Sequence, residues 1–553
     1  MRRLKKMNNI SEQKLRGGYY TPLPIAEFLI DWAINGSTTP YVLEPSMGDG
    51  VFIRQLAKRL LSKGQNKESV GKSILGVELF EEELEKAKTL LRKDGYLTDN
   101  FQLMTGDFFT LYKEISKKKY DIVLGNPPFI RYQDFPENQR DLAIEILKAN
   151  GFKPNKLTNS WLFFLLASVN LLNPNGRLAM VIPAEILQVK YAAEARVFLS
   201  KFFNSITIIS FKKLVFDGIQ QEVVLLLGDK RDNGNKGIDL IELNDVDDLR
   251  NLKDEIKKPE HFKPIDHLND KWLQYYLSKE EILLIKRLTE NKKLTNLGSL
   301  VNVDVGVVTG NNEFFVMNRD TINKYNLAKY VIPLVGRTAH LNGGVVFELE
   351  DWERSEEKGD KSYLLNYQNP LLVVLDKNIK EYVKLGEEMG IHEGYKCRIR
   401  KTWYSVPSIW IPDAFLFRQI HKYPKIVENK ARAIPTDTIH RVKVFKPEKT
   451  QQIASSFLNS LTFAFSEIYG RSYGGGVLEL EPNEAEKLPI PYSNEIIFED
   501  NKINSLLKKK SIYDALDYTD SILLKDYLGL SSDEIHSVRG IWERLSSRRI
   551  NRN

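Results

Sequence analysis

Short apolar segments alternate with amphipathic segments over the first 230 residues, and this alternation restricts the fold more than any other feature. The segment 51–62 places Phe52, Leu56 and Leu60 on one face, as a helix would. The strand-like segments are apolar at nearly every position, which is typical of parallel strands buried on both faces. We therefore predict an α/β fold, a parallel sheet with helices on both faces. The predicted strands are 41–45, 73–79, 101–105, 120–124, 177–183, 205–211 and 222–228, and the predicted helices are 51–62, 81–91 and 161–172.

The character of the chain changes after the last of these strands. Residues 234–264 are polar, charged and poor in aromatic residues, so we predict a junction at 236–290. Residues 1–235 would form the first domain. Residues 291–553 would form a second, mixed α+β domain that has short strands, many turns and a helical, basic C-terminal end.

Composition argues against several classes of protein. A single cysteine, Cys397, cannot form a disulfide within the chain, and the seven histidines show no metal-ligand spacing, so we predict no metal site. The apolar runs are too short for a signal peptide or a membrane span, which predicts a cytoplasmic protein without a membrane partner. The net charge of +7 permits a polyanionic partner but does not require one.

Acidic residues follow the first three predicted strands, at the sheet edge where parallel sheets bind ligands. Glu44 precedes a turn in which Gly48 lets the backbone approach a ligand closely. Glu78 is placed to accept the hydroxyls of a ribose, and Asp107 to accept from an adenine amino group. The turn lacks the Gly-Lys-Ser/Thr ending of a phosphate-binding loop. A glycine-rich turn can also be purely structural, but three acids at successive strand ends favour a nucleoside site.

The tetrapeptide 126–129, Asn-Pro-Pro-Phe, ends the fourth predicted strand. An amine attached to a purine ring is a poor nucleophile, because its lone pair is delocalised into the ring. The side-chain oxygen of Asn126 and the carbonyl of Pro127, on a stiff backbone, can accept its two N–H bonds and favour a pyramidal nitrogen. Phe129 offers a flat face to the ring. Asn-Pro-Pro is also good turn chemistry, which is the structural alternative.

An adenine inside a duplex must rotate out of the stack before such a site can reach its amine. Unstacking costs a few kcal/mol, which stacking on aromatic side chains can offset. Phe216, in the turn between the last two predicted strands, is the candidate to face Phe129 across the base. Ordinary core packing is the other interpretation of Phe216.

With these residues in this order, the chain resembles the gamma class of DNA amino-methyltransferases, specifically the TaqI-type enzymes that methylate adenine N6 in restriction–modification systems. The matching motifs are GYYTP at 18–22, LEPSMGDG at 43–50, Glu78, Asp107, NPPF at 126–129 and LVFDGIQQ at 214–221. The resemblance implies a Rossmann-like class I methyltransferase sheet and a C-terminal DNA target-recognition domain. It also implies that S-adenosylmethionine is the methyl donor.

The resemblance further implies roles for individual residues. Asn126 and Pro127 would hold the target amine, and Phe129 and Phe216 would stack on the two faces of the flipped adenine. The residues implied to bind the cofactor, from its methionine part through the ribose to the adenine, are Thr21, Glu44, Gly48, Glu78, Asp107 and Phe108.

Parts of the second domain also resemble the family, including VGVVTGNNEFFV at 305–316, TDTIHR at 436–441 and GRSYGGG at 470–476. Cations near these motifs suit contacts to phosphates. The candidate DNA-binding residues are Arg432, His440, Arg441 and Arg471. The implied partners are double-stranded DNA and a separately encoded restriction endonuclease that acts on the same site.

Two alternatives remain open at this point. Enzymes that methylate ribosomal RNA guanine or a protein glutamine amide also carry Asn-Pro-Pro with an aromatic residue, although the second domain favours DNA. A DNA-binding subunit with a decayed catalytic fold is the other alternative, and the intact acids and tetrapeptide argue against it. We find no segment that we would assign to a nuclease.

Overall fold

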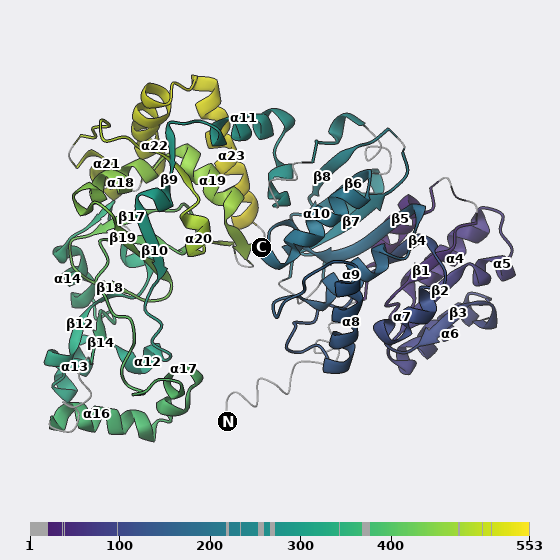
Figure 1. Ribbon diagram of the computed structural model, residues 1–553, viewed down its shortest axis with the longest axis horizontal. Helices are drawn as coiled ribbons and strands as arrows, with labels where there is room; N and C mark the ends of the chain where they lie inside the picture. Colours follow the sequence, from purple (N-terminus) through teal and green to yellow (C-terminus); the bar gives the residue numbers. More distant parts are fainter. Residues whose placement is uncertain are drawn as a thin grey trace. The chain divides into compact units, whose positions relative to one another are not determined.

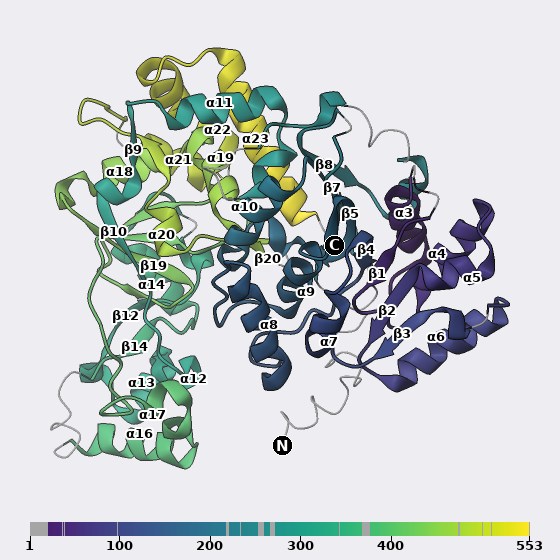
Figure 2. The same ribbon diagram turned by 45° about the vertical axis from the view of Figure 1, so that its right-hand side comes forward.

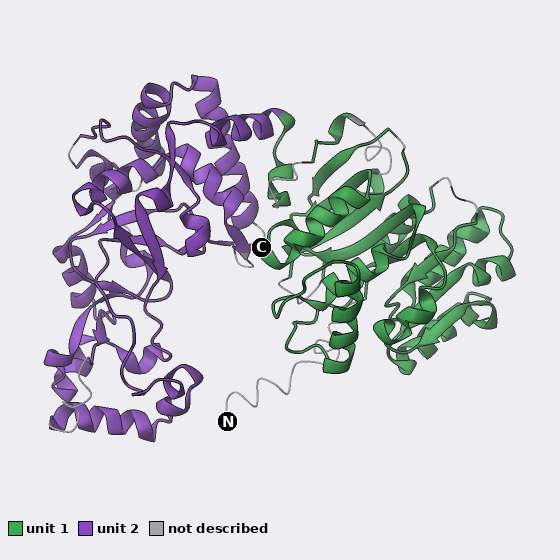
Figure 3. Ribbon diagram, in the orientation of Figure 1, with its two compact units in different colours: residues 1–279, 552–553 green, residues 280–551 purple. Residues whose placement is uncertain are grey.

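The computed structural model divides into two compact units, residues 1–279 with 552–553 and residues 280–551 (Figures 1 and 3). Each unit is described by itself. The structure describes residues 20–551 apart from 36, 38, 97, 217–220, 233, 253–258, 266–270, 342, 368–375, 474–475, 500 and 510.

An eight-stranded sheet in the order β3-β2-β1-β4-β5-β7-β6-β8 forms the centre of the first unit. The strands from β3 to β5 are parallel, β7 is antiparallel to β5 and β6, and β8 is parallel to β6. The strands are β1 (Val42–Glu44), β2 (Ile74–Glu78), β3 (Gln102–Thr105), β4 (Tyr120–Gly125), β5 (Leu172–Pro183), β6 (Ser205–Phe211), β7 (Val223–Asp229) and β8 (Gly237–Leu243).

Helices cover both faces of this sheet, as predicted. The helices are α3 (Leu23–Ala33), α4 (Val51–Ser62), α5 (Lys67–Lys72), α6 (Glu81–Lys93), α7 (Phe108–Ile115), α8 (Glu137–Ala149), α9 (Ser160–Val169) and α10 (Ala193–Phe202). Ala179 and Val181 of β5 join a buried cluster with α3, α4 and α6. The alternate residues Leu178 and Met180 are buried as well, and α9 also packs on β5. The α/β prediction is therefore confirmed.

Most predicted elements of the first unit shift by one to three residues at their ends, and two differences are larger. β5 begins at Leu172, where it pairs with Tyr120, and not at 177. The predicted junction at 236–290 contains β8, which pairs with β6 over seven residues and belongs to the sheet. β8 is an edge strand, and polar residues such as Asp239 and Glu242 interrupt its apolar pattern. Because charged segments also flank it, the sequence pattern does not predict a strand here.

The second unit is mixed α+β, as predicted, and contains five-, four-, three- and two-stranded sheets. Its strands are β9 (Leu294–Asn296), β10 (Val301–Val305), β11 (Val316–Met317), β12 (Val331–Val335), β13 (Val346–Phe347), β14 (Tyr363–Leu365), β15 (Ala414–Phe417), β16 (Gln419–Ile420), β17 (Ile426–Asn429), β18 (Ile434–Pro435), β19 (Ile439–Val444), β20 (Arg471–Tyr473), β21 (Val477–Glu479) and β22 (Pro489–Pro491). Its α-helices are α11 (Lys279–Thr289), α12 (Asn312–Phe315), α13 (Arg319–Tyr325), α14 (Leu349–Glu357), α16 (Lys377–Glu388), α17 (Tyr395–Arg398), α18 (Thr450–Phe457), α19 (Ser460–Tyr469), α20 (Pro482–Ala485), α21 (Lys502–Lys508), α22 (Ile512–Asp520) and α23 (Ser532–Ile550).

The basic C-terminal end is helical and packed. α23 lies against α19, and the buried Arg549 pairs with the buried Glu467 at 2.7 Å. The lengths and sequences of the described helices leave none that could cross a membrane.

Arg177 on β5 fastens the end of α3 to the sheet. Its guanidinium pairs with the buried Asp229 of β7 at 3.0 Å and donates to the carbonyls of Trp32, Ala33 and Asn35 at the end of α3. α3 packs on β4 and β5 (Figure 2). The other end of α3 follows Thr21, so this buried pair helps to set where the N-terminal segment meets the sheet.

We expect Arg177→Ala to destabilise the first unit by about 3–5 kcal/mol, because it leaves the carboxylate of Asp229 buried with a weakened countercharge. Hydrogen exchange of peptides from β5 and β7 measures the stability of the first unit separately from that of the second. The matched control is Arg59→Ala, which removes a half-exposed pair between α4 and Asp31 of α3 and should cost about 1 kcal/mol or less. Equal effects of the two variants would contradict the anchoring role.

Candidate active site

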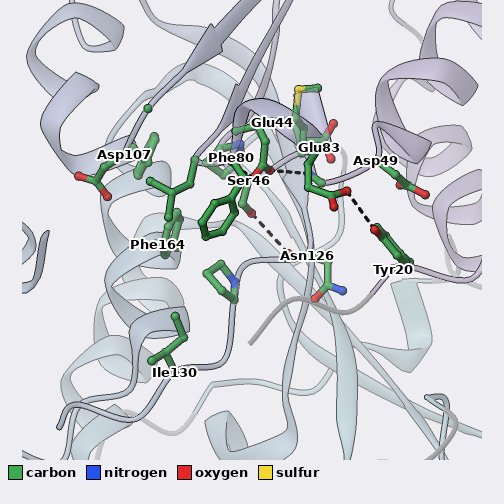
Figure 4. Close-up of a pocket in the computed structure, with 18 of the residues that line it drawn as sticks. Tyr20, Glu44, Ser46, Asp49, Phe80, Glu83, Asp107, Asn126, Ile130 and Phe164 are labelled. Carbon is green, nitrogen blue, oxygen red and sulfur yellow. Dashed lines mark hydrogen bonds between the residues drawn. The ribbon is translucent and has the colours of Figure 1, made fainter. Parts of the chain in front are cut away.

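A cavity of about 660 Å³ opens at the carboxyl ends of β1, β2 and β4 (Figure 4). A volume of this order suits a small organic ligand. The loops after β1 to β4 and the segment before α3 all contribute to its lining. The structure brings together here most of the site residues predicted from the sequence, namely Thr21, Glu44, Gly48, Glu78, Asp107, Phe108 and Asn126.

The carboxyl group of Glu44, the last residue of β1, is buried with little to offset the free-energy cost of its burial. Neither oxygen of its carboxyl group has a hydrogen-bond partner among the described residues. Burial raises the pKa of Glu44 well above its ordinary value, and the nearby carboxyls of Asp49 and Glu78 raise that pKa further, while a weak interaction with the backbone N–H of Ile53, the smallest of these effects, lowers it. A buried polar group without a partner is costly. Because Glu44 borders the cavity, its position indicates a ligand that brings a donor or a positive charge.

Glu78 is held in place by the backbone. Its Oε2 accepts from the N–H of Gly48 at 2.8 Å, and its Oε1 accepts from the N–H of Phe80 at 3.0 Å. Gly48 can present this N–H because its φ of +53° lies in the left-handed region. Each carboxylate oxygen has a second lone pair. Glu78 therefore has the acceptor capacity that a vicinal diol requires.

Asp107 lies at another side of the cavity, close to Phe164 and away from Tyr20 and Asp49 (Figure 4). The Oδ2 atom of Asp107 caps α7 by accepting from the N–H of Thr110 at 2.8 Å and from its hydroxyl at 2.9 Å. Phe108 is buried and stacks on Phe164, with ring centroids 5.4 Å apart. Asp107 thus has a structural role as well as its place in the cavity.

The turn after β4 is held from the N-terminal side by Thr21. The side-chain amide of Asn126 donates to the hydroxyl of Thr21 at 3.2 Å, and the hydroxyl of Ser46 donates to the backbone carbonyl of Asn126 at 3.4 Å. The bond to Thr21 uses a donor of the amide and not its acceptor, Oδ1. Thr21 therefore orients the side chain that sequence analysis placed at the reaction centre.

Ser160, the first residue of α9, holds the same turn from the other side and was not predicted from the sequence. Its buried hydroxyl accepts from the N–H of Ile130 at 2.7 Å and donates to the carbonyl of Pro128 at 2.5 Å. Its own N–H donates to the carbonyl of Ile130 at 2.9 Å. The signal in the sequence is a serine directly before the long apolar run 161–167.

The two aromatic residues predicted to stack on a base do not line the cavity. Phe216 is buried in the cluster that contains α3 and α4, and the half-buried Phe129 packs against the same cluster. Their stacking role stays a prediction. Residues 217–220 of LVFDGIQQ and residues 18–19 of GYYTP lie outside the described residues.

The described lining of the cavity is strongly acidic. It contains seven carboxyl groups and one amine, which are those of Glu44, Asp49, Glu78, Glu82, Glu83, Asp107, Asp134 and Lys86. Such a lining attracts a cation and repels phosphate. No group of three or more His, Cys, Asp or Glu residues arranged for a metal ion occurs in the part of the chain that the structure describes.

The predicted DNA contacts in the second unit need correction. His440 is fully buried, and its Nε2 lies 2.7 Å from the carbonyl of Leu480. Arg441 is buried, pairs with Asp304 at 2.6 Å and lies over the ring of Trp410. Both side chains make interactions inside the unit and are too buried to contact a phosphate.

The two other candidates differ from each other. Arg471 lies in β20 and pairs with Glu484 at 2.9 Å, so its charge is already compensated. Arg432 is exposed, with a φ of +53°, and its role as a DNA contact stays a prediction.

Comparison with known families gives two matches that together span most of the chain. The model of the N-6 DNA methylase family matches residues 4–295. The model of the C-terminal domain of Type II methyltransferase M.Eco57I matches residues 269–524.

Among curated proteins, the chain is 26% identical over 507 residues to Type II methyltransferase M.AccI of Acinetobacter calcoaceticus, covering 87% of this chain and 86% of the relative. It is 24% identical over 351 residues to Type II methyltransferase M.HindII of Haemophilus influenzae, covering 59% and 60%. Among solved structures, the Type IIL restriction–modification enzyme MmeI in complex with DNA matches with a TM-score of 0.59 at 13% identity, covering 98% of this chain and 80% of that one. At this identity the match concerns the fold alone.

We expect Ser160→Ala to loosen the turn after β4, because it removes both side-chain bonds to Pro128 and Ile130. Hydrogen exchange of the peptide that contains 126–131 should quicken by about 5–30-fold, from the loss of roughly 1–2 kcal/mol. The matched control is Ser168→Ala on the same helix, because the buried hydroxyl of Ser168 has no partner among the described residues. If the two variants exchange alike, Ser160 does not hold the turn.

Proposed function

Since the chain belongs to the N-6 DNA methylase family, we propose that the cavity of the first unit is its active site. The protein is a sequence-specific DNA methyltransferase of a restriction–modification system that methylates adenine at N6. Its first unit has the class I methyltransferase fold, and S-adenosylmethionine is the methyl donor. RNA or a protein amide as the methyl acceptor is not favoured.

The assignment of the cavity as the active site rests on Glu44, whose buried carboxyl oxygens have no hydrogen-bond partner among the described residues. S-adenosylmethionine supplies, when bound, a methyl group on a positively charged sulfur that leaves as a neutral thioether. Its methionine part also carries an ammonium group, which suits Glu44 in an otherwise acidic lining. Glu78 has the acceptors for the ribose, and Asp107 with Phe108 flanks the space for the adenine.

Asn126 and Pro127 would hold the target amine by accepting its two N–H bonds. Oriented acceptors preorganise the site for the charge that develops on nitrogen and need no general base before transfer. Thr21 and Ser160 support this role because they fix the turn on both sides of the tetrapeptide.

Phe129 and Phe216 would stack on the flipped adenine. Both residues pack in or against one large hydrophobic cluster in this structure. Because Phe216 is buried there, stacking on a base requires its ring to turn out of the cluster.

The second unit would recognise the target sequence, and its match to the C-terminal domain of a Type II methyltransferase supports this role. The protein contacts DNA as its substrate. We further propose that a separately encoded endonuclease cuts the same sequence when it is unmethylated, and that both proteins act in the cytoplasm with the host DNA. The names of the Type II relatives support such a pair.

We expect Asn126→Ala to lower the rate of methyl transfer by about 10²–10³-fold, because one of the two oriented acceptors is lost. Transfer of labelled methyl groups to DNA of mixed sequence measures the rate, and calorimetry should show S-adenosylmethionine binding close to that of the parent. Asn150→Ala is the matched control, because among the described residues the side-chain amide of Asn150 donates only to the carbonyl of Ile146 near the end of α8. A parental rate in Asn126→Ala would exclude the amine-binding role.

We expect S-adenosylmethionine to bind more tightly as pH rises from the ordinary pKa of a glutamate through the raised pKa of Glu44. Below the raised pKa the carboxyl group is neutral, so binding of a cation must release a proton. Calorimetry in two buffers of different ionisation enthalpy counts that proton. Glu44→Gln should abolish the release and weaken binding by about 10–100-fold, from the loss of a hydrogen bond worth roughly 1.5–3 kcal/mol.

The same variant should have the opposite effect on the empty protein. A carboxyl group whose pKa is raised by folding contributes stability that is lost as pH rises through that pKa. Glu44→Gln should therefore raise the melting temperature of the empty protein at alkaline pH. Glu82→Gln, in an exposed residue of the same lining, is the control for both effects. Proton release that persists in Glu44→Gln would assign the titration to another acid.

A further inference from the structure

The second unit contains a short segment that gathers positive charge on its surface. Residues 395–401, from α17 into the following turn, include four cations and no acid (Figure 1). Three of them, Lys396, Arg398 and Lys401, are exposed. The side chains of these three form no hydrogen bond or ion pair with another described residue, and the amine of Lys396 lies over the ring of Tyr395.

Two of the three exposed lysines on the preceding helix, α16, are paired. On α16, Lys377 lies 3.8 Å from Glu381, and Lys384 lies 3.9 Å from Glu388. The acid that precedes the segment, Glu393, is exposed and forms no ion pair with it among the described residues. Within the part of the chain that the structure describes, the 395–401 segment therefore gathers three exposed cations without an ion pair, whereas α16 has one, Lys380.

The fourth cation holds the segment in place. Arg400 donates to the carbonyls of Val308 and Thr309 at 3.0 and 2.8 Å. The next residue, Gly310, has a φ of +83°, and a Cβ at this position would lie 2.9 Å from the Cβ of Lys396. The motif at 305–316, which resembles the family, thus supplies two carbonyl acceptors and a glycine that let the 395–401 segment pack closely against it. The three exposed cations extend from a fixed backbone, which reduces the entropy lost when they bind.

Two large side chains lie exposed among these cations. Tyr395 is 65% exposed and Ile399 is 59% exposed. Four residues apart, they share one face of the helical turn. Cations interleaved with an aromatic and an aliphatic side chain match a surface that alternates phosphates with sugars and base edges.

We propose that the 395–401 segment contacts duplex DNA. Lys396, Arg398 and Lys401 bind backbone phosphates, and Tyr395 and Ile399 lie against the sugars or the groove edge between them. The proposal rests on the assignment of the second unit to target recognition. It places the phosphate contacts of this unit on exposed cations instead of the buried His440 and Arg441.

The test compares two triple variants of the full-length protein. In the first, Lys396, Arg398 and Lys401 are replaced by Gln; in the control, Lys377, Lys380 and Lys384 of the nearby α16 are replaced by Gln. Binding to a fluorescent mixed-sequence duplex is measured over a range of salt concentrations, which requires no knowledge of the recognition sequence. Each lost phosphate contact lowers the slope of log K against log salt by about 0.9. The first variant should therefore have a slope shallower by about 2–3 and the control a parental slope.

A charge-preserving variant separates charge from folding. Lys396→Arg with Lys401→Arg should keep the parental slope, and the Gln variant should bind S-adenosylmethionine like the parent. At saturating DNA the Gln variant should keep the parental kcat, with KM for DNA increased. A parental slope in the Gln variant would overturn the proposal and leave the segment to a protein partner or to solvent. Failure of the parent itself to methylate DNA would instead contradict the proposed function.

Discussion

The carboxyl group of Glu44 is the constraint on which the active site depends. A parallel sheet brings the ends of β1, β2 and β4 to one edge, and the acids that follow those strands meet in one cavity. This arrangement keeps Glu44 buried without a hydrogen-bond partner for its carboxyl oxygens among the described residues and shifts its pKa upward. Burial of this carboxyl group lowers the stability of the first unit, and a cationic ligand would supply the interaction that the carboxyl group lacks.

Rigidity around that cavity comes from residues far apart in the sequence. Thr21 orients the amide of Asn126, and Ser160 clamps the backbone just beyond the tetrapeptide. Arg177 fixes the far end of the helix that follows Thr21. A hydrogen bond in a catalytic site is useful only when its angle is maintained. The fold thus holds one short turn from the N-terminal segment, from α9 and, more remotely, from the middle of the sheet.

Much of the first unit could be predicted from the sequence, because strand periodicity and strand-end acids are local signals. The helix at 51–62 and the strand at 205–211 have their predicted bounds, and the residues expected around a nucleoside meet in one cavity. β8 was missed because an edge strand lacks a continuous apolar pattern. The burial of His440 and Arg441 was missed because the sequence does not reveal which cation finds an internal partner. Ser160 was missed because its partners are backbone atoms.

The acidic lining also bears on the order of events after methyl transfer. A lining with seven carboxyl groups and one amine attracts a sulfonium cation more strongly than the neutral thioether that remains after the methyl group has left. Part of the attraction would therefore be lost at the moment of reaction, while the contacts proposed between the nucleoside and Glu78 and Asp107 would stay the same. The residues proposed to hold the donor would thus disfavour retention of the product. Discrimination between the two follows from charge alone, without any change in the shape of the cavity.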